Sequence, residues 1–99
     1  MPAVLIADID VRDAEAYAAY RSANPAIVRQ YGGRYLAVGG DVQVIEGDWV
    51  PRRTVLIEFP DMDALRRFYD SPEYAAIRGV RWRSADSRLV AFETTAAAR

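Results

Sequence analysis

One local pattern occurs twice in this chain of 99 residues: an apolar, strand-like run is followed by a helix-forming segment that meets a capping residue and a proline. The first copy consists of the run AVLIADI, then Asp13, Ala16, Tyr20 and the pair Asn24-Pro25. The second copy consists of the run RTVLIEF, then Asp61, Ala64, Phe68 and the pair Ser71-Pro72. Two such units, each completed by one further strand, predict the order β-α-β-β-α-β of the ferredoxin-like fold, an α+β architecture.

In the first unit, residues 3–9 are expected to form a strand and Asp13 to cap a helix. Proline cannot donate to the helical ladder, so the helix is predicted to break or restart at Asn24-Pro25. Gly32-Gly33 is expected to end it. Residues 34–46 are expected to form an extended piece, interrupted at Gly39-Gly40 and with Val42 and Val44 in alternation, followed by a turn at EGDWVP. The second unit is expected to have a strand over 53–59, a helix from Pro60-Asp61 and a short helix from Pro72. An irregular segment over 79–85, a strand over 87–93 and a frayed tail TTAAAR are expected to complete the chain.

Right-handed crossovers place both helices on one face of a four-stranded antiparallel sheet, in one domain spanning residues 1–99. The other face is left uncovered. It is predicted to carry Val4, Ile6, Asp8, Thr54, Leu56, Glu58, Arg88, Val90 and Phe92. This set is too apolar for a face in contact with water, so we expect a second copy of the chain to cover it in a homodimer.

Several chemistries are excluded because the chain contains no His, no Cys and no Lys. Cysteine nucleophiles, Cys/His zinc sites, His-ligated haem, Ser-His-Asp triads and Schiff-base lysines are therefore impossible for this chain alone. No carboxylate spacing typical of a metal loop is visible, so no metal and no cofactor are expected. Acid–base work would fall to Asp, Glu or Tyr, and charge stabilisation to Arg, hydroxyls or backbone amides.

The net charge is −1, and all 13 basic residues are Arg. This balance favours neither nucleic acid nor a membrane surface as a partner. The start MPAVLIADID lacks the basic and long apolar regions of a signal peptide, and no stretch reaches the length of a membrane span. We therefore expect a cytoplasmic protein.

Four segments together resemble one bacterial family: YGGRYLAVGGDVQVIEGDW, RTVLIEFPDMDAL, FYDSPEY and SADSRLVAFE. They are similar to the domain of unknown function 1330, and the resemblance extends over roughly residues 3–94. That family belongs to the dimeric α+β barrel superfamily, so the resemblance implies this fold and a homodimer. It implies no particular activity and no catalytic residues. Superfamily relatives include cofactor-independent oxygenases, isomerases of small ring compounds and haem-binding enzymes, and the absence of His argues against the last group.

The candidate catalytic residues are Asp8, Glu58 and Arg88. On the expectation that the first and third strands run parallel and the fourth antiparallel to the first, all three would converge at one end of the uncovered face. Asp41 would join Glu58 there if the EGDWVP hairpin sets the register. Such a cluster could raise a carboxyl pKa or clamp an acidic ligand; alternatively, it is an ion-pair cluster that holds the dimer or sheet end together.

The candidate substrate-binding residues are Arg34, Asp41, Trp49, Tyr20, Tyr69 and Tyr74. Trp49 could cover a cleft or pack on the partner subunit. The three tyrosines could line a pocket between helices and sheet or belong to the core. Arg34, and Arg81 or Arg83 near the segment expected to be irregular, could bind a carboxylate or remain solvated.

Two functions remain open. The first is a protein that binds or transforms a small organic molecule, aromatic or carboxylated, without metal or haem. The second is a homodimeric module without chemistry that acts through contacts with another protein. An enclosed cavity lined by Tyr and Arg would favour the first.

Overall fold

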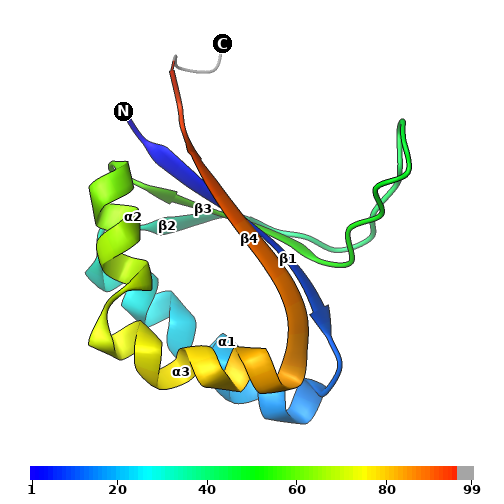
Figure 1. The fold of residues 1–99 in the computed structure, drawn as a ribbon, viewed down its shortest axis with the longest axis horizontal. Helices are drawn as coiled ribbons and strands as arrows, with labels where there is room; N and C mark the ends of the chain where they lie inside the picture. Colours follow the sequence, from blue (N-terminus) through cyan, green and yellow to red (C-terminus); the bar gives the residue numbers. More distant parts are fainter. Residues whose placement is uncertain (96–99) are drawn as a thin grey trace.

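The computed structural model, which describes residues 1–95, has the predicted ferredoxin-like order, with the two helices expected in the second unit (Figure 1). The elements are β1 (Ala3–Val11), α1 (Ala14–Gln30), β2 (Arg34–Val38), β3 (Thr54–Phe59), α2 (Met62–Tyr69), α3 (Pro72–Ser84) and β4 (Ala85–Glu93). The sheet has the strand order β2-β3-β1-β4, and all neighbouring strands are antiparallel. The α+β ferredoxin-like prediction is therefore confirmed. Within residues 1–95, no helix is long and apolar enough to cross a membrane.

The helices cover one face of the sheet, as the connections predicted (Figure 1). Alternate strand residues point into the core between sheet and helices. From the sheet these are Ala3, Leu5, Ala7, Ile9, Val55, Ile57 and Phe59. A chain of aromatic rings from the helices packs on them, with centroids 5.2 Å apart for Phe59 and Phe68 and 4.7 Å apart for Phe68 and Tyr74.

Helix α1 continues through Pro25, so the predicted break at Asn24-Pro25 is wrong. Proline removes one donor from the ladder, yet the residues on both sides of it are held by tertiary contacts. Tyr20, Asn24 and Val28 are all buried, at most 6% exposed. The Asn24 side chain also donates a 2.8 Å hydrogen bond to Tyr35 on β2. These contacts on one face hold the helix together across the missing bond.

Helix α3 extends to Ser84, so the irregular segment predicted over 79–85 is also wrong. Arg81 and Ser84 are buried on the same face as Tyr74, and this packing keeps the segment helical. The Ser84 carbonyl accepts hydrogen bonds from the backbone N–H groups of Arg12 and Asp13. β4 therefore begins directly at Ala85, two residues earlier than expected.

Residues 40–53, here called the arm, leave the sheet between β2 and β3 and project away from it (Figure 1). The strand pairing expected around Val42 and Val44 is absent from this described segment. The hydrogen bond from Gly39 N–H to the Thr54 carbonyl, 2.7 Å long, closes its base. Residues 40–50 are all exposed, so no buried face imposes a register on the arm.

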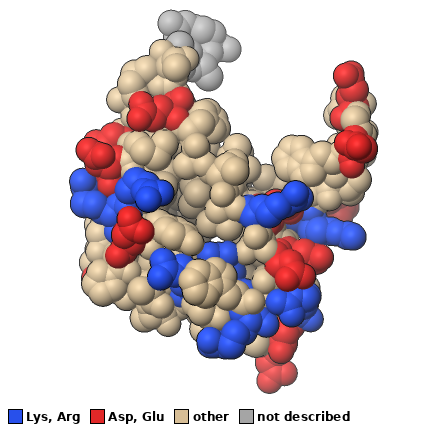
Figure 2. Space-filling view, in the orientation of Figure 1, with Lys and Arg blue, Asp and Glu red and all other residues tan. Residues whose placement is uncertain are grey.

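The arm carries three carboxylates and no arginine before Arg52, and Figure 2 shows acidic side chains at its end. At the other end of the chain, the backbone N–H of Thr94 donates a hydrogen bond to the Pro2 carbonyl, so the chain stays paired with the N-terminal segment for one residue after β4. The remainder of the tail predicted to fray, residues 96–99, lies outside the described residues.

Candidate functional site

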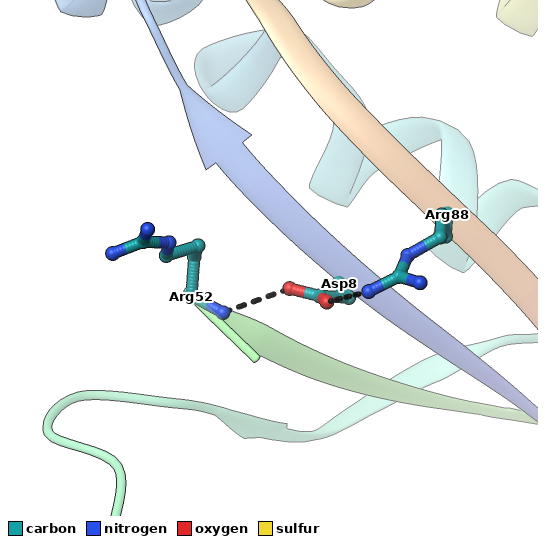
Figure 3. Close-up of polar contacts among 3 residues, drawn as sticks. All are labelled: Asp8, Arg52 and Arg88. Carbon is teal, nitrogen blue, oxygen red and sulfur yellow. Dashed lines mark hydrogen bonds and ion pairs between the residues drawn. The ribbon is translucent and has the colours of Figure 1, made fainter. Parts of the chain in front are cut away.

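Asp8 and Arg88 face each other on the uncovered side of the sheet, as predicted (Figure 3). Arg88 Nη2 lies 3.2 Å from Asp8 Oδ2, and the backbone N–H of Arg52 donates to Asp8 Oδ1 at 2.9 Å. The Asp8 side chain is only 12% exposed. Burial raises its pKa, but the Arg52 N–H, the Arg88 guanidinium and the Trp49 side chain together outweigh burial, and the net shift of the pKa is downward. Asp8 is therefore an ionised, bonded carboxylate rather than a proton donor.

Glu58 lies far from this pair, so the predicted convergence of three residues is wrong. The error was the direction of β3, which runs antiparallel to β1. Asp8 is opposite Thr54, whereas Glu58 is opposite Val4, four residues along β1. At about 3.4 Å per residue, this separates the two carboxylates by about 13 Å.

Glu58 instead pairs with Arg34 on the edge strand, with Arg34 Nε 2.9 Å from Glu58 Oε1. These two ion pairs lie on either side of the apolar middle of the open face. Asp41 belongs to neither pair. Because Arg34 is opposite Glu58 and β2 then runs away from it, Asp41 lies beyond the other end of β2, and its predicted approach to Glu58 is wrong.

One pocket lies on the other side of the sheet, between the core-facing strand residues and helices α1 and α3. It encloses about 250 Å³. Its apolar wall is formed by Leu5, Ala7, Ile9, Val55, Ile57, Leu89, Pro25 and Val38. Its polar groups are Tyr17, Tyr20, Tyr35, Tyr74, Asn24, Arg21, Arg53 and Arg81. An aromatic and arginine-lined cleft between helices and sheet was the predicted form of a small-molecule site.

Two of the three candidate tyrosines line this pocket, and their hydroxyls share a 2.7 Å hydrogen bond, Tyr20 to Tyr74. Tyr69 does not line it. Its ring packs against the Tyr74 ring, with the two centroids 5.4 Å apart. The Arg78 guanidinium lies over the Tyr69 ring, 5.2 Å from its centroid. Tyr69 is therefore a supporting core residue, the alternative that the sequence left open.

Arg81 is the most unusual residue of the pocket, because it is a charged residue with an exposure of only 3%. Nε donates to the Tyr74 hydroxyl at 3.3 Å, Nη1 donates to the Ser87 hydroxyl, and the Tyr20 ring centre lies 5.9 Å from Cζ. The ion pairs found in residues 1–95 do not include Arg81. The pocket contains two further arginines, Arg21 and Arg53, and no Asp or Glu among its described lining residues.

Protonation in the pocket follows from burial. Burial, reinforced by the neighbouring Tyr74, raises the pKa of Tyr20 strongly, and burial also raises the pKa of Tyr17 and of Tyr35. These phenols are neutral at physiological pH and act as hydrogen-bond donors. Burial lowers the pKa of Arg81, but the tyrosine oxygens around it outweigh burial and raise it, so the guanidinium stays charged. The pocket offers one buried cation and several donors, without a carboxylate base.

Asn24, Tyr17 and Tyr35 were not among the site residues predicted from the sequence. Tyr17, Tyr20 and Asn24 follow one another at spacings of three and four, which places them on one helical face. The proline after Asn24 obscured that pattern, since it suggested that the helix ends there. The other candidates lie outside the pocket: Trp49 is 58% exposed on the arm, and Arg34 is on the open face. Among residues 1–95 no cluster of carboxylates suited to a metal ion occurs.

Solved structures with the same fold include proteins without an assigned function. The protein RPA0582 from Rhodopseudomonas palustris is 23% identical, with a TM-score of 0.78 over 97% of this chain and 84% of that one. A dimeric ferredoxin-like protein from Thermobifida fusca is 19% identical, with a TM-score of 0.65 over 95% of this chain and 92% of that one.

One similar structure has a described activity. SnoaB from Streptomyces nogalater, a cofactor-independent oxygenase, is 15% identical, with a TM-score of 0.65 over 97% of this chain and 95% of that one. At these identities the likeness concerns the fold. No curated protein matches the chain. The sequence profile of one family matches residues 2–95, nearly the whole length. The chain therefore belongs to the family described as domain of unknown function DUF1330.

Proposed function

We propose that this protein is a homodimer that binds a small, planar, anionic organic molecule in the pocket between its sheet and helices. The observation that carries the proposal is the charge of the pocket: three arginines line it, one of them buried, and no described lining residue is acidic. A buried cation is costly unless it is paired. A carboxylate, enolate or phenolate of a ligand would supply the missing partner for Arg81.

The pocket walls favour a flat ring. Tyr17, Tyr20 and Tyr74 provide aromatic surfaces, and aliphatic side chains of the strands face them. An apolar cavity of about 150 Å³ holds benzene. The present volume of about 250 Å³ therefore has room for a substituted ring or two fused rings.

The homodimer rests on the open face of the sheet. Val90 and Phe92 are 62% and 48% exposed there, and they are joined by Ile6 and Leu56 in neighbouring registers. The two ion pairs, Asp8 with Arg88 and Arg34 with Glu58, flank this apolar middle, and we assign them to the rim of the dimer interface. The structure from Thermobifida fusca, which is described as dimeric, has the same fold.

The pocket also constrains any reaction. Tyr17, Tyr20 and Tyr35 are neutral donors, so they would stabilise a developing negative charge on the ligand rather than remove a proton. Chemistry that proceeds through an anion of the ligand, as in a cofactor-independent oxygenase or an isomerase, fits this arrangement. In the alternative of a module without a ligand, the buried Arg81 cation would have no anionic partner among the described residues.

The test compares binding of 2-naphthoate and its neutral counterpart 2-naphthamide by calorimetry. Wild type is expected to prefer the carboxylate, and Arg81→Met to lose at least about tenfold in affinity for it, the loss of a charge-assisted hydrogen bond. Arg83→Met, which removes an exposed arginine of the same helix, is the matched control and is expected to leave affinity unchanged.

Access to the pocket is tested separately. Val38 lines the pocket yet is 52% exposed, so Val38→Trp is expected to fill the mouth without disturbing the fold and to weaken binding. Ala26→Trp on the exposed side of α1 is its control. Failure of wild type to bind 2-naphthoate, or binding that is insensitive to both Arg81→Met and Val38→Trp, would overturn the proposal.

A further inference from the structure

Asn24 presents an unsatisfied polar atom to the pocket. Its side chain is buried at 4% exposure and lines the cavity. Nδ2 donates to the Tyr35 hydroxyl at 2.8 Å, whereas Oδ1 has no hydrogen-bond partner among residues 1–95. A buried carbonyl oxygen that has lost water and gained no donor destabilises the fold, so such atoms are uncommon unless a ligand or solvent molecule supplies the donor.

Asn24 on α1 and Arg81 on α3 both line the pocket, and each is anchored to a different strand. Asn24 is tied to Tyr35 on β2, and Arg81 is tied to Ser87 on β4. β2 and β4 are the two outer strands of the sheet, separated by β3 and β1. At about 4.8 Å per strand, the two anchoring strands are about 14 Å apart. A ligand bound between them meets a cation at one end and a bare acceptor at the other.

The chemistry at the two ends differs in kind. Arg81 carries donors and a positive charge, and the neighbouring Tyr20 and Tyr74 hydroxyls add to them. Asn24 Oδ1 can only accept a hydrogen bond. One anionic group satisfies the first end, but the second end requires an O–H or N–H group. A ligand with an anion alone would leave Oδ1 unsatisfied.

We infer that the ligand carries a hydroxyl or amino group on the side of its ring opposite the anionic group, and that Asn24 selects for it. The inference rests on the proposed function and narrows it to one ligand class, hydroxylated or aminated aromatic acids and their enolate or phenolate equivalents. The anionic oxygen lies at Arg81, and the donor reaches Asn24 Oδ1. Asn24 thus determines the orientation of the bound ring in the pocket.

The probes are 2-naphthoate and three derivatives that differ from it by one hydroxyl, at ring position 5, 6 or 7. For wild type, at least one hydroxylated probe is expected to bind about three- to tenfold more tightly than 2-naphthoate, the range of one additional neutral hydrogen bond. Asn24→Leu, similar in size but without Oδ1, is expected to abolish this preference while it still binds 2-naphthoate. Ser22→Leu, at an exposed position of α1, is the control.

A purely structural role for Asn24 is tested by Tyr35→Phe. This variant removes the partner of Nδ2 and leaves Oδ1 in place, so the ratio of the affinities for hydroxylated and plain probes is expected to persist even where both affinities change. Loss of the ratio in Tyr35→Phe and its retention in Asn24→Leu would overturn the inference. So would a wild type that binds 2-naphthoate through Arg81 but prefers none of the hydroxylated probes. Absence of binding by any probe would overturn the proposed function as well, which separates the two failures.

Discussion

Arg81 and Arg88 are the same residue type in opposite environments. The Arg88 side chain is 76% exposed and paired with Asp8, whereas Arg81 is 3% exposed and has no acidic partner in the part of the chain that the structure describes. Exposed ion pairs contribute about 0–1 kcal/mol, because water screens them. A buried guanidinium has lost water and needs a partner. Solvation, rather than residue type, makes Arg81 the better candidate for a functional residue.

Asp8 gives a prediction for the dependence of stability on pH. Its folded pKa lies below the ordinary value of 3.8, so the carboxylate stabilises the folded state fully above the unfolded pKa. This contribution is lost as pH falls through the lower folded pKa. Asp8→Asn is therefore expected to lower the free energy of unfolding by about 1 kcal/mol near neutral pH, with the difference from wild type shrinking below pH of about 4.

Urea unfolding of both proteins between pH 3 and 7 measures this difference. Asp48→Asn, at an exposed carboxylate of the arm, is the control for a general effect of net charge. A difference between wild type and Asp8→Asn that stays constant over the whole pH range would contradict the assignment of Asp8 as a stabilising, ionised group.

At the level of the elements, α1 and α3 both continue through residues that usually interrupt helices. Pro25 and Gly79 weaken the local backbone, but each lies beside buried positions, Asn24 and Val28 in α1 and Arg81 and Ser84 in α3. Packing on the sheet outweighs an unfavourable local preference of about 1 kcal/mol for glycine and about 3 kcal/mol for proline. Packing therefore keeps α1 helical where a break was predicted and α3 helical where an irregular segment was predicted.

Two glycines provide a matched test. Gly79→Ala is expected to raise the free energy of unfolding by about 0.5–1 kcal/mol, because alanine favours the helix and the new methyl group meets only the flexible end of Arg83. Gly33→Ala is expected to lower it by about 1–3 kcal/mol, since a Cβ there would lie 2.6 Å from the Phe59 ring and 2.8 Å from Val28. Thermal and urea unfolding of both variants measure the two signs. A stabilised Gly33→Ala would show that the packing around Phe59 is looser than described.

At the scale of the whole molecule, the sheet is covered by helices on one face only, and the arm projects beyond it (Figure 1). The uncovered face has an apolar middle with an ion pair on either side of it. The helix-covered face holds the pocket. Association and ligand binding therefore occupy opposite faces of one sheet in the proposed function, and they can be changed separately.

The double variant Val90→Glu with Phe92→Glu is expected to convert a dimer into a folded monomer, because two charges would have to be buried in the interface. Sedimentation equilibrium measures the mass, and circular dichroism checks the fold. Trp82→Glu, at an apolar residue of α3 with 57% exposure, is the control and should stay dimeric. A monomeric wild type, or a dimeric double variant, would refute association through this face.

Local pattern was sufficient for the kinds of elements, for the caps Asp13, Asp61 and Ser71, and for the division of strand residues between two faces. Caps and strand alternation depend on residues a few positions apart, and the chain shows them directly. The same alternation correctly placed Asp8 and Arg88 on the open face. It could not place Glu58 relative to Asp8, because the direction of one strand beside another is not a local property.

The candidate pocket depended on contacts across the fold. Tyr20 and Tyr74 are 54 positions apart and share a hydrogen bond, while Asn24 meets Tyr35 across the space between α1 and β2. Whether Arg81 is solvated or buried is likewise decided by the elements that pack around it. The repeated strand–helix unit determined the architecture, because its signals lie in residues that are close together in the sequence. Burial, strand direction and the contacts between distant side chains were decided by tertiary packing, and the candidate site depends on all three.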